Sequence, residues 1–323
     1  MIKTTIVIFV LFFLAFCGFV VYDLTTAKRR KEVYRVKSSA TAYLLLLPSV
    51  VLAFLFIMLP ILYSLGYAFT DYYLLDPNNI KFILFDNFKE LFEEISDKGM
   101  LYSAIKNTAT FVIGVVPLQI ILALLLALFV NRPGFGSKIF KVCFFAPVVI
   151  SLSVTAFLWQ QILAPGEGGL LNSMLSVFGV PPHDWLYDPN TAMPCIILLS
   201  AWQGCGYQML IFLSGLSNIR KDLYEAASLD GANWWNKFWL VTWPGLRSTF
   251  VYILITVFIG ACRIMTQPML MTGYQEHTVT LSYYMYQVGY KDYWVGTSTA
   301  VALLMTIFIG GITLIQRRLF REK

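Results

Sequence analysis

Polar side chains recur within two stretches of the sequence that are otherwise apolar. They are Ser200, Trp202, Gln203, Tyr207 and Gln208, together with Gly204, in the first stretch, and Arg263, Thr266 and Gln267 in the second. Hydroxyl, amide and guanidinium groups bind polar ligands through hydrogen bonds, and aromatic rings add flat apolar contacts. Polar groups within an apolar span are costly unless they line a cavity or face a partner. We therefore expect a binding path at these residues.

Bond-breaking chemistry has little support in the sequence. The histidines His183 and His277 and the five cysteines are widely spaced along the chain, so neither a metal site nor a His-based catalytic centre is indicated. The sequence has no G-x-x-x-x-G-K-[ST] pattern, the loop that holds the phosphates of ATP in many ATPases. We expect a protein that is not an enzyme and that binds no cofactor or metal of its own.

The elements that must position these residues are membrane spans. Of the 323 residues, 58% are hydrophobic and only 13% are charged, a balance typical of a membrane protein. A spanning helix needs about 20 mostly apolar residues. The apolar runs predict an all-α polytopic membrane protein with seven helices, near 4–22, 42–66, 104–130, 139–163, 193–216, 249–272 and 296–316.

The basic residues indicate the orientation of the chain in the membrane. Of the 24 Lys and Arg residues, 17 lie in the segments 28–37, 131–141, 218–248 and 317–323, which alternate with the remaining loops. By the positive-inside rule these four segments are cytoplasmic, so we expect the N-terminus outside and the C-terminus inside. Because the positive charge alternates by loop, it gives no support for nucleic-acid binding.

The chain divides near residue 39. Residues 1–39 predict an accessory transmembrane helix and a basic cytoplasmic linker, and residues 40–323 hold the other six helices. Cleavage of the first helix as a signal peptide is the alternative. In the outside loops, 87–95 has the spacing of a short amphipathic helix, and 164–192 is rich in Gly and Pro and should turn repeatedly.

The cytoplasmic loop 218–248 has a helix–turn–helix pattern. We expect a helix over 222–230, a turn at Gly231 and a second helix over 232–239, closed by Pro244. The second helix gathers Trp234, Trp235, Phe238 and Trp239 on one face. Such a face could lie on the inner leaflet, or it could pack into a soluble partner, where aromatic anchors are typical.

This loop resembles the EAA motif of permease subunits in binding-protein-dependent ABC importers. The motif reads E-A-A-x3-G-x9-I-x-L-P, and its spacing matches here at every element, with Val and Trp in place of the usual Ile and Leu. The matching residues are Glu225, Ala226, Ala227, Gly231, Val241, Trp243 and Pro244. The resemblance extends over roughly 40–323. There the sequence is similar to the oligosaccharide-type sugar permeases, such as those of the maltose and multiple-sugar systems.

The resemblance implies the bacterial cell membrane as the location and a set of partners. These are a second permease, two cytoplasmic ATPase subunits that bind ATP and Mg, an extracytoplasmic sugar-binding protein and membrane lipid. It also implies that the loop docks into the ATPase. The expected coupling residues are Glu225, Ala226, Ala227, Gly231, Trp234, Trp235, Phe238 and Pro244.

The resemblance implies a sugar path in the membrane. Ser200, Trp202 and Gly204 match a stretch that contributes to the sugar site of maltose-type permeases, and Gln203 replaces an apolar residue there. Helix packing is the alternative for Trp202 and for Tyr207. We add Gln208, Arg263 and Gln267 to the predicted substrate path.

Arg263 leaves three interpretations open. It could bind a sugar hydroxyl, an anionic group of the substrate or an acid on the companion subunit.

Other classes of membrane protein fit the sequence less well. An ion-coupled secondary transporter usually carries acids at membrane depth. The Asp and Glu residues here fall in loops or at span ends, including Asp23 at the end of the first predicted span. A structural scaffold, or an ABC permease for a non-sugar or anionic-sugar substrate, remains an alternative.

Overall fold

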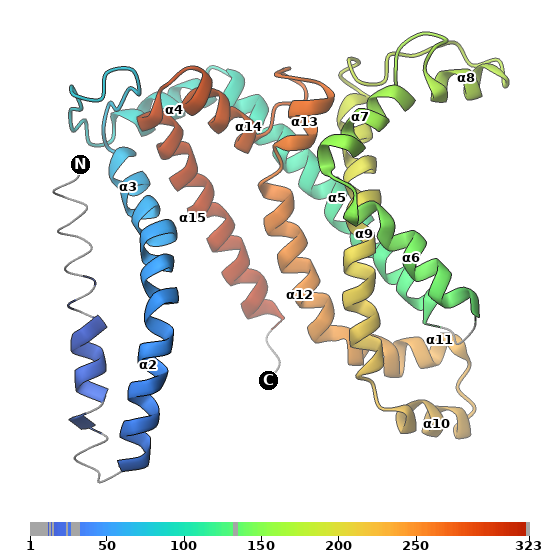
Figure 1. Ribbon diagram of the computed structural model, residues 1–323. Helices are drawn as coiled ribbons and strands as arrows, with labels where there is room; N and C mark the ends of the chain where they lie inside the picture. The colour runs from blue at the N-terminus through green and yellow to red at the C-terminus, as the bar shows by residue number, and fades with distance from the viewer. Residues whose placement is uncertain are drawn as a thin grey trace.

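A computed structural model describes residues 12, 14, 16–23, 25, 26, 33–131 and 135–320. Within these ranges helices form the regular structure, and the β-structure consists of two isolated bridges. Long helices run side by side, and shorter helices gather at their two ends (Figure 1). The predicted all-α class is confirmed.

Five helical segments are long and apolar enough to cross a membrane in the described part of the chain. They are Thr41–Tyr67, Met100–Val130, Ala192–Ser217, Trp234–Cys262 and Val295–Leu319, and a bent pair would make a sixth. The first segment combines most of α2 (Val33–Ala53) with the π turn η1 (Phe54–Met58) and α3 (Leu59–Tyr67). The others contain α5 (Met100–Val130), α9 (Ala192–Ser217), α12 (Trp243–Cys262) and α15 (Val295–Leu319).

The N-terminal prediction lies largely outside the described residues. Of the predicted span 4–22, residues 12, 14 and 16–22 are described, and all of them are helical. This helix lies beside α2, where the Tyr43 hydroxyl donates a hydrogen bond of 3.0 Å to the Asp23 carboxylate. Because α2 begins at Val33, the described end of the predicted linker is helical and no break marks residue 39.

Two predicted spans are interrupted, so their prediction as single helices is wrong. The span 139–163 consists of α6 (Phe135–Val149) and α7 (Leu152–Ile162), which meet at an angle of 97°. Ser151 starts α7 with an extended ψ of 135°, a conformation that ends one helix and begins another. The span 249–272 stops at Cys262 and resumes as α13 (Thr266–Met271).

The packed centre of the molecule lies between α5 and α9. The buried side chains of α9 include Ile196, Leu199, Met209 and Phe212, and they belong to one apolar cluster with residues of α5, α7 and α12. Gly206 allows α9 to approach α6 closely, since a Cβ there would lie 2.3 Å from the Phe144 carbonyl oxygen. This packing fixes the orientation of the polar face of α9.

Short elements cover the end of the molecule that is drawn at the top of Figure 1. They are α4 (Asp86–Ser96), α8 (Leu170–Ser176), α14 (Leu281–Tyr286) and the π turn η3 (Gln287–Lys291), beside α7 and α13. Helix α4 confirms the predicted amphipathic segment. The Tyr284 hydroxyl donates a 2.6 Å hydrogen bond to Glu94, and burial together with this bond raises the pKa of the phenol.

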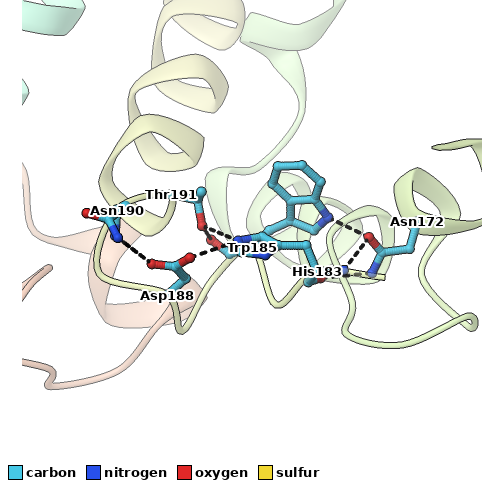
Figure 2. A network of polar contacts seen from close by, with 6 residues as sticks. All are labelled: Asn172, His183, Trp185, Asp188, Asn190 and Thr191. Carbon is cyan, nitrogen blue, oxygen red and sulfur yellow. Dashed lines mark hydrogen bonds and ion pairs between the residues drawn. The ribbon is translucent and has the colours of Figure 1, made fainter. Parts of the chain in front are cut away.

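The loop 164–192 turns repeatedly, as expected, and is held by its own hydrogen bonds (Figure 2). The indole nitrogen of Trp185 donates to the Asn172 side-chain oxygen at 2.8 Å. The His183 Nε2 atom lies 3.0 Å from the Asp188 carboxylate. Trp185 is therefore half-buried and bonded within the loop, whereas Tyr187 is exposed.

At the opposite end lie α10 (Lys221–Leu229), α11 (Trp234–Lys237) and the π turn η2 (Phe238–Thr242), which continues into α12. The prediction that Pro244 closes the second helix of the loop is wrong. Pro244 lies in the first turn of α12, within a continuous helical segment Trp234–Cys262. The π turn has the Trp243 amide bonded to the Phe238 carbonyl, directly before the proline that lacks an N–H.

Candidate functional site

A polar cavity of about 420 Å³ lies beside α9, where both interrupted spans contribute. Its polar lining comes from α5, α9, the end of α12 and the start of α13. These residues are Gln119, Ser200, Gln203, Gln208, Thr256, Arg263, Thr266 and Gln267. Six of the eight residues predicted for a substrate path line this one cavity: Ser200, Gln203, Gly204, Gln208, Arg263 and Gln267.

Periodicity explains the contribution of α9. Ser200, Gly204 and Gln208 are spaced by four residues, so they follow one another along a single face of the helix. The Ser200 hydroxyl donates to the Ile196 carbonyl one turn earlier at 2.7 Å, which satisfies the hydroxyl proton. Gln203 flanks this row, and its amide nitrogen lies 3.5 Å from the Ile150 carbonyl at the α6–α7 break.

Gln119 reaches this face from α5. Its amide nitrogen donates a 3.0 Å hydrogen bond to the Gln208 side-chain oxygen, which joins the two helices across the cavity. Gly204 makes room for it, because a Cβ at that position would lie 2.3 Å from the Gln119 amide nitrogen. Gln119 was not predicted for the path, although an amide within the apolar run 104–130 was a signal that could have identified it.

The helix breaks place irregular backbone at the cavity. Val148 comes from the end of α6, and Met265 comes from the link between α12 and α13. In a membrane, non-helical backbone is tolerated where protein buries it or where it lines a hydrated cavity. Interrupted helices often form the binding sites of transporters for this reason. The arrangement suits the binding and release of a polar solute.

Arg263 occupies a different place from the one predicted. It was expected well inside a helical span, but it follows the last residue of α12 at φ −99° and ψ 14°, outside helical geometry. Its side chain is exposed and lines the cavity. A formal charge at membrane depth costs about 2.5 kcal/mol or more on insertion scales, and access to a hydrated cavity lowers that cost.

Two predicted path residues lie away from the cavity lining. Trp202 packs against Trp159 of α7, with ring centroids 5.9 Å apart, in agreement with the helix-packing alternative. Tyr207 is half-exposed on α9 and is absent from the lining of the polar cavity. The aromatic part of the predicted path is therefore not assembled with the amide groups in the described chain.

The cytoplasmic loop presents a second candidate surface. Helix α10 ends at Leu229, and Gly231 follows with a φ of +77°, a left-handed conformation that favours glycine. The Ala232 amide then donates to the Ala227 carbonyl at 2.9 Å, which closes the turn. The predicted turn at Gly231 is thus present, and the Asn233 side chain caps α11 by accepting from the Asn236 amide at 2.9 Å.

Large aromatic side chains remain uncovered on this loop. Trp234, Trp235 and Trp239 are 61%, 57% and 47% exposed, while Phe238 is half-buried and stacks on Trp234 with centroids 6.0 Å apart. On α10, Glu225 and Ala226 are exposed and Ala227 is half-buried.

A hydrogen bond ties α10 to this aromatic segment. The hydroxyls of Tyr224 and Thr242 lie 2.9 Å apart, so α10 and η2 are held together.

Comparison with known proteins gives the family. Residues 119–322 match the family described as the binding-protein-dependent transport system inner membrane component. The chain is 33% identical to the probable ABC transporter permease protein YesP of Bacillus subtilis (strain 168), over 86% of this chain and 90% of that protein. It is 30% identical to the arabinooligosaccharides transport system permease protein AraP of the same organism, over 87% and 88%.

Two further likenesses agree with this result. The lactose transport system permease protein LacF of Rhizobium radiobacter is 30% identical, over 83% of this chain and 88% of that protein. A chain in the crystal structure of a bacterial ABC transporter involved in the import of the acidic polysaccharide alginate matches 90% of this chain. That match covers 98% of the solved chain, with a TM-score of 0.78 and 23% identity, and it supports the fold. The resemblance inferred from the EAA-like residues is confirmed: the chain belongs to the family of binding-protein-dependent transport system inner membrane components, the permease subunits of ABC importers.

Proposed function

We propose that this chain is one of two membrane-spanning subunits of an ATP-driven saccharide importer, and that the polar cavity is part of its sugar path. The observation that carries the proposal is the convergence of four glutamines, a serine and an arginine on one cavity at two helix breaks. Amide and hydroxyl groups suit the hydroxyls of a sugar. The names of AraP and LacF, which refer to arabinooligosaccharides and lactose, support a carbohydrate substrate.

The cytoplasmic loop 218–248 is proposed to dock into an ATPase subunit. The exposed aromatic side chains of Trp234 and Trp235 suit a partner's cleft, where such anchors often supply much of the binding energy. Glu225 is assigned a charged contact with the ATPase. The small side chains of Ala226 and Ala227 allow the ATPase to approach α10 closely, and Phe238 stacks against Trp234.

Both ends of this loop lead directly to the cavity. Helix α9 carries Ser200, Gly204 and Gln208 at the cavity and ends at Ser217, and three residues separate it from Lys221, where α10 starts. At 1.5 Å per residue, Gln208 and Ser217 lie about 14 Å apart along the axis. The continuous helix from Trp234 to Cys262 reaches the cavity at Arg263. A displacement of the loop by the ATPase would therefore reach the sugar path through two stiff helices.

The complete importer would contain partners besides the ATPase subunits. We assign it a second permease that closes the path, an extracytoplasmic sugar-binding protein, and ATP and Mg bound by the two ATPase subunits. The alternating basic loops support a cytoplasmic C-terminus and an N-terminus outside the bacterial inner membrane. The accessory helix of residues 1–39 is assigned to this subunit as an addition to the six-helix core.

Reconstitution tests the proposal. The chain, its companion permease and their ATPase subunits are placed in liposomes, and uptake of radiolabelled oligosaccharides is measured with saturated binding protein and internal ATP. We expect uptake that requires ATP hydrolysis and that persists when ion gradients are collapsed. Uptake driven by an ion gradient without ATP would identify a secondary transporter. Transport of solutes other than carbohydrates would contradict the sugar assignment.

A further inference from the structure

Arg263 brings a formal positive charge to a cavity whose other polar lining groups are uncharged amides and hydroxyls. No Asp or Glu belongs to this lining. Over the described ranges, the Arg263 guanidinium takes part in no ion pair and no hydrogen bond, although its donors are exposed at the cavity. The charge therefore faces the space that a solute would occupy.

A purely structural role explains this residue poorly. A cation after the last residue of a helix interacts favourably with the helix dipole, and Arg263 follows Cys262, the last residue of α12. However, the hydrogen bonds that end the helix here come from the backbone, where the Arg263 amide donates to the Gly260 carbonyl at 3.2 Å. Among the described residues, the guanidinium donates to none of the carbonyls in that last turn.

We propose that the cavity selects saccharides that carry a carboxylate, as uronic acids do, and that Arg263 binds this carboxylate. The inference rests on the proposed function and names the substrate class of the same site. A guanidinium presents parallel N–H donors that match the two oxygens of a carboxylate, and such charge-assisted pairs are stronger than neutral hydrogen bonds. Gln203 and Gln267 line the same cavity and are available for the neighbouring sugar hydroxyls.

The substrate would supply the negative charge that the cavity lacks. A neutral sugar would leave the guanidinium hydrated but unpaired. The preference for an acidic saccharide is therefore the difference between the binding free energies of the acidic and the neutral saccharide. Hydrogen bonds to charged groups contribute enough to change affinity by about tenfold to a hundredfold. We expect a preference of that size for the uronate over the otherwise identical neutral saccharide.

The test measures binding to the assembled importer without its binding protein, so that the selectivity of the binding protein does not enter. Trigalacturonate is compared with its carboxyl-reduced form, in which each carboxylate is replaced by a primary hydroxyl, by calorimetric titration. The variants are Arg263→Gln, Arg263→Lys and the control Arg317→Gln. Arg317 lies exposed in the last turn of α15 and is not part of the cavity lining.

We expect the wild-type importer and Arg317→Gln to prefer trigalacturonate, Arg263→Lys to retain part of the preference, and Arg263→Gln to lose it. Binding of the neutral trisaccharide should stay within about twofold in all of them, because it makes no charged contact. A wild type that binds both saccharides equally, or prefers the neutral one, overturns the inference. So does an equal loss of both in Arg263→Gln, which would indicate a structural role or an acid of the companion subunit.

A second outcome separates this inference from the proposed function. An importer that transports neutral oligosaccharides with ATP, but neither binds nor transports uronates, contradicts only the assignment of Arg263. An importer that transports no saccharide of either kind contradicts the proposed function, and this inference with it.

Discussion

Gly204 controls how the amide of Gln119 crosses from α5 to α9. In Gly204→Ala the new Cβ would meet the Gln119 amide nitrogen at 2.3 Å, so the glutamine must move and its bond to Gln208 should break. Such a bond contributes about 0.5–1.5 kcal/mol. We expect a several-fold higher KM for saccharide uptake in proteoliposomes, with the assembled importer still recovered in normal yield.

Gly310→Ala is the matched control for this variant. Gly310 lies in α15, and a Cβ there would meet no atom within 4 Å. Both substitutions gain about the same helix propensity, roughly 1 kcal/mol, so a difference between them reports the contact with Gln119. Adding Gln119→Ala should relieve the clash in Gly204→Ala. Equal KM values in Gly204→Ala and Gly310→Ala would argue against the role of the glutamine bridge.

Gly231 is constrained by its backbone alone. Its φ is +77°, and a Cβ there would meet no atom within 4 Å, so a substitution is strained by conformation and not by lack of space. The left-handed conformation costs a residue with a Cβ about 1–2 kcal/mol, with Asn better tolerated than β-branched residues. We expect Gly231→Val to lower ATP-driven uptake at least tenfold and Gly231→Asn to keep most of it.

Membrane insertion should be unaffected in both Gly231 variants, because the turn lies outside the candidate spans. Yield and thermal stability in detergent provide this check. Wild-type uptake by Gly231→Val would show that the angle between α10 and α11 does not matter for coupling.

Among individual residues, more of those that line the cavity could be predicted from the sequence than of the contacts between them. Gln203, Gln208 and Gln267 could be predicted because amides in an apolar run need a hydrated surface or a partner. Gln119 was missed because it is the one amide in the otherwise apolar stretch 111–130 of the predicted span. Trp202 was predicted with these residues but is not part of the cavity lining, because residue type alone does not give the direction in which a helical side chain points.

Helices α6 and α9 depend on the absence of a side chain at Gly206. The nearest atom to a Cβ there is the Phe144 carbonyl oxygen at 2.3 Å, and a backbone atom cannot move away as a flexible side chain can. Overpacking of this kind costs about 1–3 kcal/mol. We expect Gly206→Ala to lower the melting temperature of the purified chain in detergent.

Gly66→Ala in α3 serves as the control, since a Cβ at that position would meet no atom within 4 Å. This substitution should leave the melting temperature unchanged or raise it slightly. If Gly206→Ala behaved in the same way, α6 and α9 would not be in close backbone contact.

The elements themselves were predicted unevenly. The long apolar spans, α4 and the α10–Gly231–α11 turn follow from hydrophobic periodicity and from glycine. The break at 150–151 was not apparent, because residues 147–150 are apolar and Ser151, Ser153 and Thr155 do not show by type which of them begins a helix. The break after Cys262 was not predicted, and Arg263 was placed within a helix. Composition alone does not show whether an arginine lies inside a span or at its end.

Several candidate membrane spans are covered only in part by other helices of this chain. In the most apolar window of each span, 50% of the residues of Ala192–Ser217 are buried, against 11% for Thr41–Tyr67. Side chains such as Leu44, Leu45 and Phe56 are more than two-thirds exposed. Lipid can cover such faces, but packing against protein also stabilises a membrane helix through close contacts.

We therefore expect the companion permease to cover part of these spans. The melting temperature of this chain, purified with its companion, should exceed that of the chain alone in the same lipid–detergent mixture, because a partner that binds the folded state stabilises it. The same temperature in both preparations would mean that lipid alone covers these faces.

The side chain of Gln160 joins the two half-helices that follow the breaks. From α7 its amide nitrogen donates to the Leu270 and Met271 carbonyls of α13, at 2.7 and 3.2 Å. These bonds hold α7 and α13 to each other, and the short links 150–151 and 263–265 join them to α6 and α12. We therefore expect α7 and α13 to move together if the two links at the edge of the cavity bend during transport.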